Sequence, residues 1–274
     1  MTDNDHGLSA TTLALTEIQL QQFINHGYVK VEDAFTPVQA EQARSIFWND
    51  LSSQGCMPDD PSSWRHAVIR LGMYEHPSVV ATANTARLHI AFDQLVGLDN
   101  WWPCMSVGTI PVRFPSADDP GDMGWHVDPS FDYEQANFMD WRINIHSRGR
   151  ALLMLMLYSD VTQDDAPSLI RVGSHRDIAR ALAPAGESGM TLTELLPYIA
   201  NTAHRSVISA TGKAGTVYLC HPFLVHSAQM HRGTQPRFLA QPPLLARSAY
   251  GIENLHASEF PIARAITAAL EKNT

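Results

Sequence analysis

The residues with the most specific chemistry in this chain are a histidine and an aspartate two positions apart. They are His126 and Asp128, in the segment GWHVD at positions 124–128. On a strand, residues two apart point to the same face, so both side chains can reach one ion while Val127 points away. Together with a remote histidine such as His226, they would supply two imidazoles and one carboxylate, the set that non-haem Fe(II) oxygenases use.

Three histidines lie close together later in the chain and compete for the place of third ligand. His221 precedes Pro222, which cannot donate a ladder hydrogen bond and fits poorly in a central strand. His231 precedes the turn-like pair at 232–233, so its side chain is expected to be solvated. These positions favour His226, and they make His221 a structural or supporting residue.

Composition limits the partners of the chain. The 274 residues carry a formal net charge of −9, and 45% of them are hydrophobic. An ordinary soluble core is therefore expected. Nucleic acids and anionic membranes require a concentrated positive field, so neither is an expected partner. A small neutral, amphipathic or cationic substrate fits better, and the composition gives no prediction of the oligomeric state.

The cysteines and the N-terminus indicate a cytoplasmic protein. Cys56, Cys104 and Cys220 are too few and too widely spaced for a disulfide framework. Residues 1–14 lack the basic and apolar regions of a secretory signal. The longest apolar run, at 151–158, is far shorter than the roughly 20 residues that span a bilayer.

The first part of the chain, residues 1–105, has mainly helical patterns. Helices are predicted at 16–25 and from 36 to about 51, each after a threonine that can cap the helix. A short strand is predicted at 28–31, and one long amphipathic helix is predicted at 76–98. This part is expected to pack on a β core.

Residues 106–250 have the pattern of that core, with short runs of β-branched and aromatic residues between Gly, Pro and Asp. The predicted strands lie at 106–114, 124–128, 151–158, 168–172, 206–209, 215–220 and 237–241. Such a series is typical of an antiparallel barrel or jelly roll. Helices are predicted at 191–200 and 257–270, the latter within a C-terminal part at 251–274. The whole chain, 1–274, is interpreted as one domain.

Five segments, in order, resemble the phytanoyl-CoA dioxygenase family of Fe(II)/2-oxoglutarate-dependent oxygenases. They are FINHGYV at 23–29 with the helix from Pro37, WHVD at 125–128, YSDV at 158–161 running into APS at 166–168, VGSH at 172–175, and GTV at 215–217 through HP at 221–222 to His226 and Arg237. The resemblance implies a double-stranded β-helix, a cupin-like jelly roll. It also implies that Fe(II), 2-oxoglutarate and O2 are used to hydroxylate a small organic molecule, such as a secondary metabolite or an amino-acid derivative, with release of succinate and CO2.

The same resemblance assigns roles to individual residues. It makes His226 the third iron ligand beside His126 and Asp128, and it makes Arg237 the residue that holds the distal carboxylate of 2-oxoglutarate. A guanidinium suits that task because its donors can bind a carboxylate bidentately. Arg70 is a possible second contact to the cosubstrate. Related halogenases replace the carboxylate ligand with a small residue, so an intact Asp128 favours hydroxylation.

Several alternatives remain open at the level of sequence. Arg232 competes with Arg237, and His146 and His175 have structural explanations that are simpler than metal binding. Five aromatic residues near the predicted metal pair could line a substrate pocket or belong to the core: Trp125, Phe131, Tyr133, Phe138 and Trp141. The same cofactors could drive desaturation, epoxidation or ring closure. A cupin-like protein that binds a metal or ligand without turnover is the alternative outside enzymes.

Overall fold

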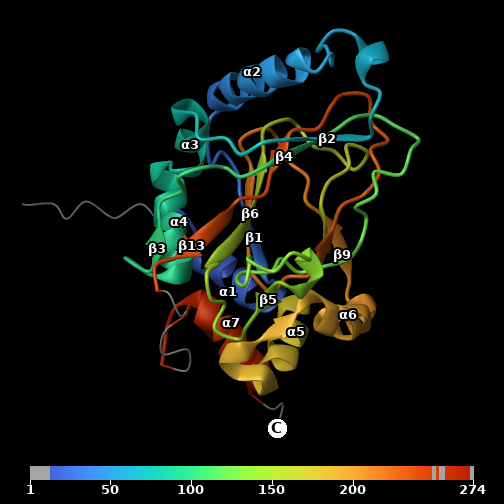
Figure 1. Cartoon of the computed structure of the whole chain (residues 1–274). Coiled ribbons are helices and arrows are strands. Elements are labelled where there is room, and N and C mark those ends of the chain that lie inside the picture. Colours follow the sequence, from blue (N-terminus) through green and yellow to red (C-terminus); the bar gives the residue numbers. More distant parts are fainter. Residues whose placement is uncertain (1–12, 249–250, 253–256, 272–274) are drawn as a thin grey trace, which may run out of the picture.

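Two β-sheets with helices at both ends form the centre of the structure (Figure 1). The structure is a computed structural model, and it describes residues 13–248, 251–252 and 257–271. Most of residues 1–14, in which no secretory signal is predicted, lie outside the described residues, as do parts of the predicted C-terminal segment at 251–274.

The N-terminal elements follow the capping signals in the sequence. Helix α1 (Glu17–His26) begins with a capping box at Thr16 and ends at Gly27, whose φ of 84° favours glycine. Strand β1 (Tyr28–Val31) follows directly, and helix α2 (Pro37–Ser53) again begins with a threonine capping box. The predicted helices and the strand are confirmed to within two residues.

The single helix predicted at 76–98 is wrong, because the structure has two helices there. Helix α3 (Pro77–Ala83) ends at Asn84, and helix α4 (Ala86–Val96) begins after Thr85. The Thr85 hydroxyl accepts a hydrogen bond from the backbone N–H of Leu88 at 3.3 Å, as an N-cap does. A local cap therefore divides a stretch whose apolar pattern looks continuous.

The larger sheet has the strand order β1-β10-β6-β13-β3, and β12 also pairs with β6. Its members besides β1 are β6 (Leu152–Leu157), β10 (Val217–Cys220), β12 (Leu239–Ala240), β13 (Pro243–Ala246) and β3 (Trp101–Trp102). All pairs are antiparallel. Every residue of β6 is buried, which indicates that both faces of the sheet are covered.

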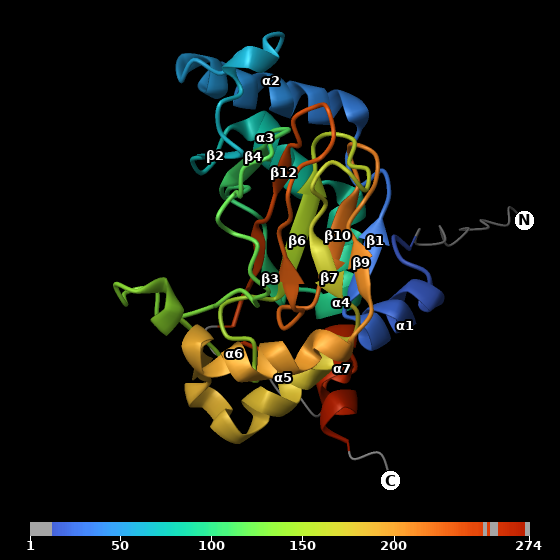
Figure 2. The same ribbon diagram turned by 90° about the vertical axis from the view of Figure 1, so that its right-hand side faces the viewer.

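The smaller sheet has the order β11-β7-β9, formed by β11 (His226–Ser227), β7 (Leu169–Arg171) and β9 (Val207–Ser209). Two further antiparallel pairs are β2 (Val68–Leu71) with β4 (Ile110–Arg113), and β5 (Arg142–Ile143) with β8 (Met190–Thr191). Helices α5 (Ser174–Leu182), α6 (Leu192–Asn201) and α7 (Pro261–Leu270) lie together at one end of the strands, opposite α2 and α3 (Figures 1 and 2).

The core has separate layers, and successive side chains of β6 point alternately into two of them. Leu153, Leu155 and Leu157 belong to an apolar cluster that also contains Ile170 of the smaller sheet, so this cluster lies between the two sheets. The alternate residues of β6 pack with helices α2, α3 and α4. A third cluster joins α5, α6 and α7. Antiparallel sheets enclosing an apolar interior match the predicted jelly roll.

None of the helices in the described part of the chain has the length and apolar character that crossing a bilayer requires.

Candidate metal centre

His126 and His226 are joined through their backbones at the edge of the smaller sheet. The N–H of each residue donates to the carbonyl of the other, at 3.0 and 2.9 Å, and the two ring centroids lie 4.3 Å apart. Directly opposed residues of an antiparallel bridge place their side chains on the same face. The smaller sheet thus carries both imidazoles at one point.

The strand predicted at 124–128 is wrong as a regular element, because His126 alone forms a β-bridge there. Pro129 follows Asp128 and has no N–H to continue a ladder. The geometric consequence drawn from the strand nevertheless holds, since the side chains of His126 and Asp128 still meet.

Three ligand atoms converge at this point. Nε2 of His126 and Nε2 of His226 each lie 3.7 Å from Oδ1 of Asp128. All three atoms lie within 4.8 Å of one another, close enough for one ion to contact them all. The structure thus brings together the three residues named as ligands from the sequence.

The ring orientations suit metal binding. Nδ1 of His126 lies 2.8 Å from the carbonyl oxygen of Gly124, and Nδ1 of His226 lies 3.1 Å from that of Leu224. A carbonyl oxygen only accepts hydrogen bonds, so Nδ1 carries the proton in each neutral imidazole. The lone pair of each Nε2 is then free for a metal, as in most histidine metal sites.

Arg150 holds Asp128, the third residue of the candidate site, and was not recognised in the sequence. Its Nη1 donates to Oδ2 of Asp128 at 2.9 Å, and its Nη2 donates to the carbonyl of Pro129 at 3.3 Å. Burial alone would raise the pKa of Asp128, but Arg150 and the two imidazoles lower it below the usual value. The carboxylate is therefore ionised and has one oxygen left for a metal.

Burial has the opposite effect on the imidazole of His226. It lowers the pKa of His226 to about 4, and the neighbouring His126 acts in the same direction. His226 is therefore neutral at physiological pH, which is the form that binds a metal.

Arg237 lies inside the fold without an acidic partner. Its side chain donates to the carbonyls of Ala166 and, at 3.3 Å, of Pro111, and only 2% of the residue is exposed. It forms no ion pair with a carboxylate of the described residues, and its Nε has no hydrogen-bond partner among them. Burial lowers the pKa of Arg237 to about 9, so the guanidinium stays charged at neutral pH. An uncompensated buried charge favours an anion.

The other two arginines considered from the sequence lie at the surface. The guanidinium of Arg70 pairs with Asp122, and 53% of its side chain is exposed. Arg232 is also exposed. Asp122 is shared with Arg113, a buried arginine on β4 that the sequence interpretation missed. The alternating directions of side chains along β4 could have revealed Arg113. Ile110 and Val112 face the helices, so Arg113 must face the other way.

Of the remaining histidines, one lies where it was not expected. His231, predicted to be solvated, is 4% exposed, because the chain after it turns back along β4. His221 and His175 are buried with ring centroids 5.1 Å apart, and Nε2 of His175 lies 3.1 Å from the carbonyl of Ile24. The backbone carbonyl of His146 accepts a hydrogen bond from Ile252 at 2.7 Å.

The aromatic residues near the metal ligands form two groups. In the segment after Asp128, Trp141 contacts Tyr133 and Phe138 edge to face, and Tyr133 and Phe138 are exposed. Trp125 instead lies under Arg171, whose guanidinium carbon is 4.1 Å from the centroid of the Trp125 ring. Phe131 is buried under Arg148.

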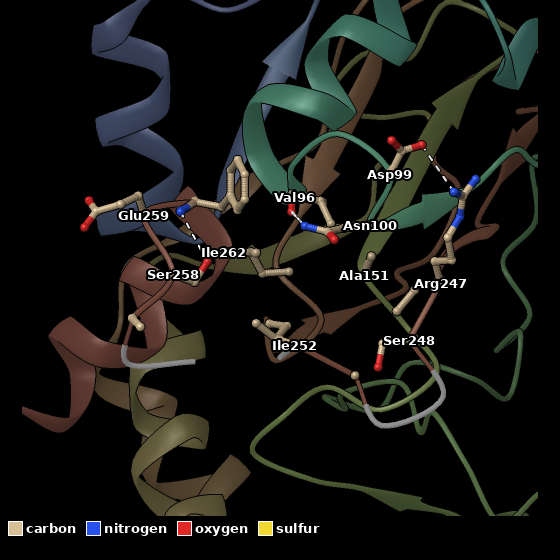
Figure 3. Close-up of a pocket in the computed structure, with 14 residues that line it drawn as sticks. Val96, Asp99, Asn100, Ala151, Arg247, Ser248, Ile252, Ser258, Glu259 and Ile262 are labelled. Atoms are coloured by element: carbon tan, nitrogen blue, oxygen red, sulfur yellow. Dashed lines mark hydrogen bonds and ion pairs between the residues drawn. The ribbon is translucent and has the colours of Figure 1, made fainter. Parts of the chain in front are cut away.

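A cavity of about 860 Å³ is formed by other residues, near the ends of α4 and α7 (Figure 3). At its wall Asp99 and Arg247 form an ion pair at 3.2 Å, and Asn100 donates to the carbonyl of Val96 at 2.9 Å. None of the three converging ligands lines it, and neither does Arg237. Its volume therefore does not describe the space above the metal ligands.

Comparison with solved structures supports the fold. The crystal structure of EctD from S. alaskensis with 2-oxoglutarate and 5-hydroxyectoine is 22% identical over 91% of this chain and 84% of that chain, with a TM-score of 0.55. HygX from Streptomyces hygroscopicus with nickel and 2-oxoglutarate bound is 18% identical over 83% of this chain and 85% of that chain, with a TM-score of 0.53.

A third similar structure is the non-haem alpha-ketoglutarate-dependent carbocyclase SnoK from nogalamycin biosynthesis. It is 16% identical over 90% of this chain and 92% of that chain, with a TM-score of 0.52. No family model matches the chain, and a comparison with curated proteins found no match. At these identities the likeness establishes the fold, which is the predicted cupin-like jelly roll of this group of oxygenases.

Proposed function

We propose that this chain is an Fe(II)- and 2-oxoglutarate-dependent oxygenase that hydroxylates a small organic molecule and releases succinate and CO2. One observation carries the proposal: two imidazoles and an ionised carboxylate converge in a fold that also buries an arginine without an acidic partner. The similar structures of EctD and HygX were solved with 2-oxoglutarate, one of them with nickel, and a further EctD structure contains iron. The five ordered segments support membership of the phytanoyl-CoA dioxygenase family.

Each residue has a defined task in this proposal. His126, Asp128 and His226 would hold Fe(II), and Arg237 would bind the distal carboxylate of 2-oxoglutarate. Iron, 2-oxoglutarate and O2 supply the oxidising chemistry, while the protein binds and orients the reactants. Arg150 keeps Asp128 ionised and fixes its orientation. Because Asp128 occupies the position that halogenases leave open, hydroxylation is favoured over halogenation.

The proposal extends to the setting of the reaction. We place the activity in one domain, 1–274, acting on a small molecule and not on nucleic acid or a membrane. A cytoplasmic location fits the three cysteines, each of which is free and buried. The net charge of −9 favours substrates that are neutral or cationic.

The direct test measures succinate formed from 2-oxoglutarate by purified protein loaded with Fe(II) under air, with and without candidate substrates. Oxygenases of this kind also consume 2-oxoglutarate slowly without substrate, so iron-dependent succinate is expected even before the substrate is known. The control variant is His204→Gln, at an exposed histidine away from the ligands. Failure to bind iron, or iron binding without any succinate, contradicts the proposal.

Product analysis decides among the possible outcomes of the oxidation. Desaturation, epoxidation or ring closure would use the same residues, and the similarity to a carbocyclase makes ring closure worth testing. A cupin-like binding protein without turnover would have no use for a buried, unpaired arginine. In that case Arg237→Met would leave ligand binding unchanged.

A further inference from the structure

Two of the segments singled out in the sequence, 172–175 and 221–222, contain none of the proposed ligands, yet both contact the turn that leads to His226. Oγ of Ser174, the first residue of α5, accepts a hydrogen bond from the N–H of Val225 at 2.9 Å. His221 follows β10 and begins the turn, and its own N–H donates to the carbonyl of Gly27 at 2.8 Å. The whole turn at 222–225 is buried. Its conformation is therefore set by protein contacts and not by water.

The peptide unit between Leu224 and Val225 connects Ser174 with the candidate metal centre. Its N–H donates to Oγ of Ser174 at 2.9 Å, and its carbonyl oxygen lies 3.1 Å from Nδ1 of His226. A peptide unit is planar and trans, so its N–H and its C=O point in opposite directions and turn together. By holding the N–H, Ser174 therefore also fixes the direction of the carbonyl that accepts from His226.

His221 holds the beginning of the same turn. Its Nδ1 accepts from the N–H of Phe223 at 3.2 Å, and its carbonyl accepts from the N–H of Leu224 at 2.9 Å. Burial lowers the pKa of His221, and the neighbouring His175 acts in the same direction, so the ring is neutral at physiological pH. A neutral ring that accepts at Nδ1 carries its proton on Nε2. The imidazole of His221 thus serves this turn as a fixed acceptor.

The support of the other imidazole is different. Nδ1 of His126 lies 2.8 Å from the carbonyl oxygen of Gly124, two residues earlier, which is the same local pattern as in His226. Gly124 is exposed, however, whereas Leu224 is 1% exposed. An exposed backbone group can exchange its partner for water, while a buried one cannot do so without cost. The orientation of His226 is therefore the more firmly fixed of the two.

We propose that Ser174 and His221 are positioning residues of the metal centre. Acting through the peptide unit between Leu224 and Val225, they keep the proton of His226 on Nδ1 and direct its Nε2 lone pair toward the other two ligands. The inference rests on the proposed function, because it takes the point where the three ligands converge as an iron site. It goes further by giving a role to two residues outside the ligand set.

The first measurement observes the imidazole of His226 in the metal-free protein. Long-range 1H–15N correlation spectra of protein labelled with 15N-histidine distinguish the two neutral tautomers of each ring, and the spectrum of His226→Gln identifies the signal. At pH 7.5 the wild type is expected to have the proton on Nδ1 alone. Ser174→Ala removes the acceptor of the Val225 N–H with little change of volume. It is expected to give a mixture of tautomers, because the Leu224 carbonyl can then turn away from the ring.

A pair of variants at His221 separates its acceptor from its bulk. His221→Leu fills the space without an acceptor. His221→Asn places Oδ1 where Nδ1 was, and asparagine side chains often accept from the N–H two residues later. His221→Leu is therefore expected to mix the tautomers of His226, and His221→Asn to keep the wild-type form. In titrations with Mn(II), Ser174→Ala and His221→Leu should each raise Kd about tenfold, and His221→Asn by less than about threefold.

The matched control is Thr82→Val, which also removes a buried hydroxyl. Thr82 lies in α3, at the opposite end of the strands from α5 (Figures 1 and 2), and its Oγ1 donates to the carbonyl of Val79 at 2.6 Å. The control should lower the free energy of unfolding in urea, as Ser174→Ala does. It should leave the tautomer of His226 and the Kd for Mn(II) unchanged, because a loosened fold alone does not redirect this ring.

The results decide each part of the proposal. A wild-type His226 with its proton on Nε2 overturns the proposal, and so does a mixture of tautomers in Thr82→Val. An unchanged tautomer in Ser174→Ala overturns the role of Ser174. An unchanged tautomer in His221→Leu, or a mixture in His221→Asn, overturns the role of the His221 acceptor. If the tautomers and Kd values change as expected but the wild type forms no succinate, the positioning role stands and the oxygenase function fails. If succinate forms and the tautomers do not change, the reverse holds.

Discussion

Arg150 donates a hydrogen bond to Oδ2 of Asp128 at 2.9 Å, while Oδ1 of the same carboxylate lies 3.7 Å from Nε2 of both His126 and His226. The two oxygens of Asp128 therefore have different surroundings, one facing a guanidinium and the other facing two imidazoles. This arrangement favours binding of a metal through a single oxygen. It also makes Arg150, which contacts no metal position itself, a residue that positions the ligand.

Replacing Arg150 with methionine is expected to weaken metal binding about tenfold or more, as is usual when a residue supporting a ligand is removed. Burial of Asp128 is then opposed only by the two imidazoles, so its pKa rises. Because the carboxylate must be ionised to bind, metal affinity should begin to fall at a higher pH than in the wild type. Titrations with Mn(II) between pH 5.5 and 8 measure this, with Arg148→Met as the exposed control. Identical pH profiles would contradict the role of Arg150.

Replacing His226 with alanine should reduce metal affinity by about two orders of magnitude or more, because a site with two ligands remains. The low pKa of His226 has a further consequence in the wild type. An ordinary histidine would lose metal to protons near pH 6.5, but a pKa of about 4 means that His226 keeps its metal-binding form well below that pH. Metal titrations of the wild type, His226→Ala and the control His204→Ala check both expectations. Retention of wild-type affinity in His226→Ala would exclude it as a ligand.

Arg237→Met should have opposite effects on binding and stability. Affinity for 2-oxoglutarate is expected to fall about a hundredfold, because a buried charged donor pair is lost. The free energy of unfolding of the metal-free protein should rise by about 1 kcal/mol, because a buried charge without an acidic partner is replaced by an apolar chain. Calorimetric titration and urea unfolding measure the two quantities. A destabilised variant would mean that the bonds to Ala166 and Pro111 outweigh the cost of the charge.

The buried histidines predict how stability depends on pH. Burial lowers the pKa of His175 from its usual 6.5 to about 3, and the pKa of His221 is lowered too. The folded state binds these protons less well than the unfolded state, so their contribution to stability is present above pH 6.5 and is lost as pH falls toward 3. Each such histidine should cost about 1.4 kcal/mol per pH unit in that range.

Urea unfolding at pH 7.5, 6 and 5 measures this loss. His175→Gln keeps a donor for the Ile24 carbonyl and cannot be protonated, so the stability of this variant should fall less steeply with pH. The exposed His204→Gln serves as the control and should keep the wild-type slope. A wild-type slope in His175→Gln would show that other groups cause the acid sensitivity.

The sequence alone predicted those site residues that can be identified from their neighbours along the chain. His126 and Asp128 are neighbours in one short segment, and His226 was favoured over His221 and His231 by its neighbours in the chain. Arg150 was missed because its pairing with Asp128 requires the chain between them to fold back, which no local pattern specifies. Arg113 was missed for a similar reason, since its bridge to Arg237 depends on the pairing of distant segments.

The fold shows the same division between local and distant information. Helices with a threonine capping box were placed to within two residues, and strand β6 followed from its apolar run. The break at Thr85 was missed because the apolar pattern continues across it, although a threonine in front of a helical stretch was a local signal. His231 was misplaced because a turn-like pair beside it says nothing about what later packs over its ring.

The backbone bridge between His126 and His226 joins positions one hundred residues apart in the chain. Closing a loop of this length costs entropy before any contact compensates for it, and contacts of such separation form slowly during folding. Until that closure, His226 is not held beside the local pair His126 and Asp128. In the proposed function, iron would therefore bind a chain whose sheets have already closed and would not nucleate the fold. Metal uptake during refolding would accordingly report the last stage of assembly.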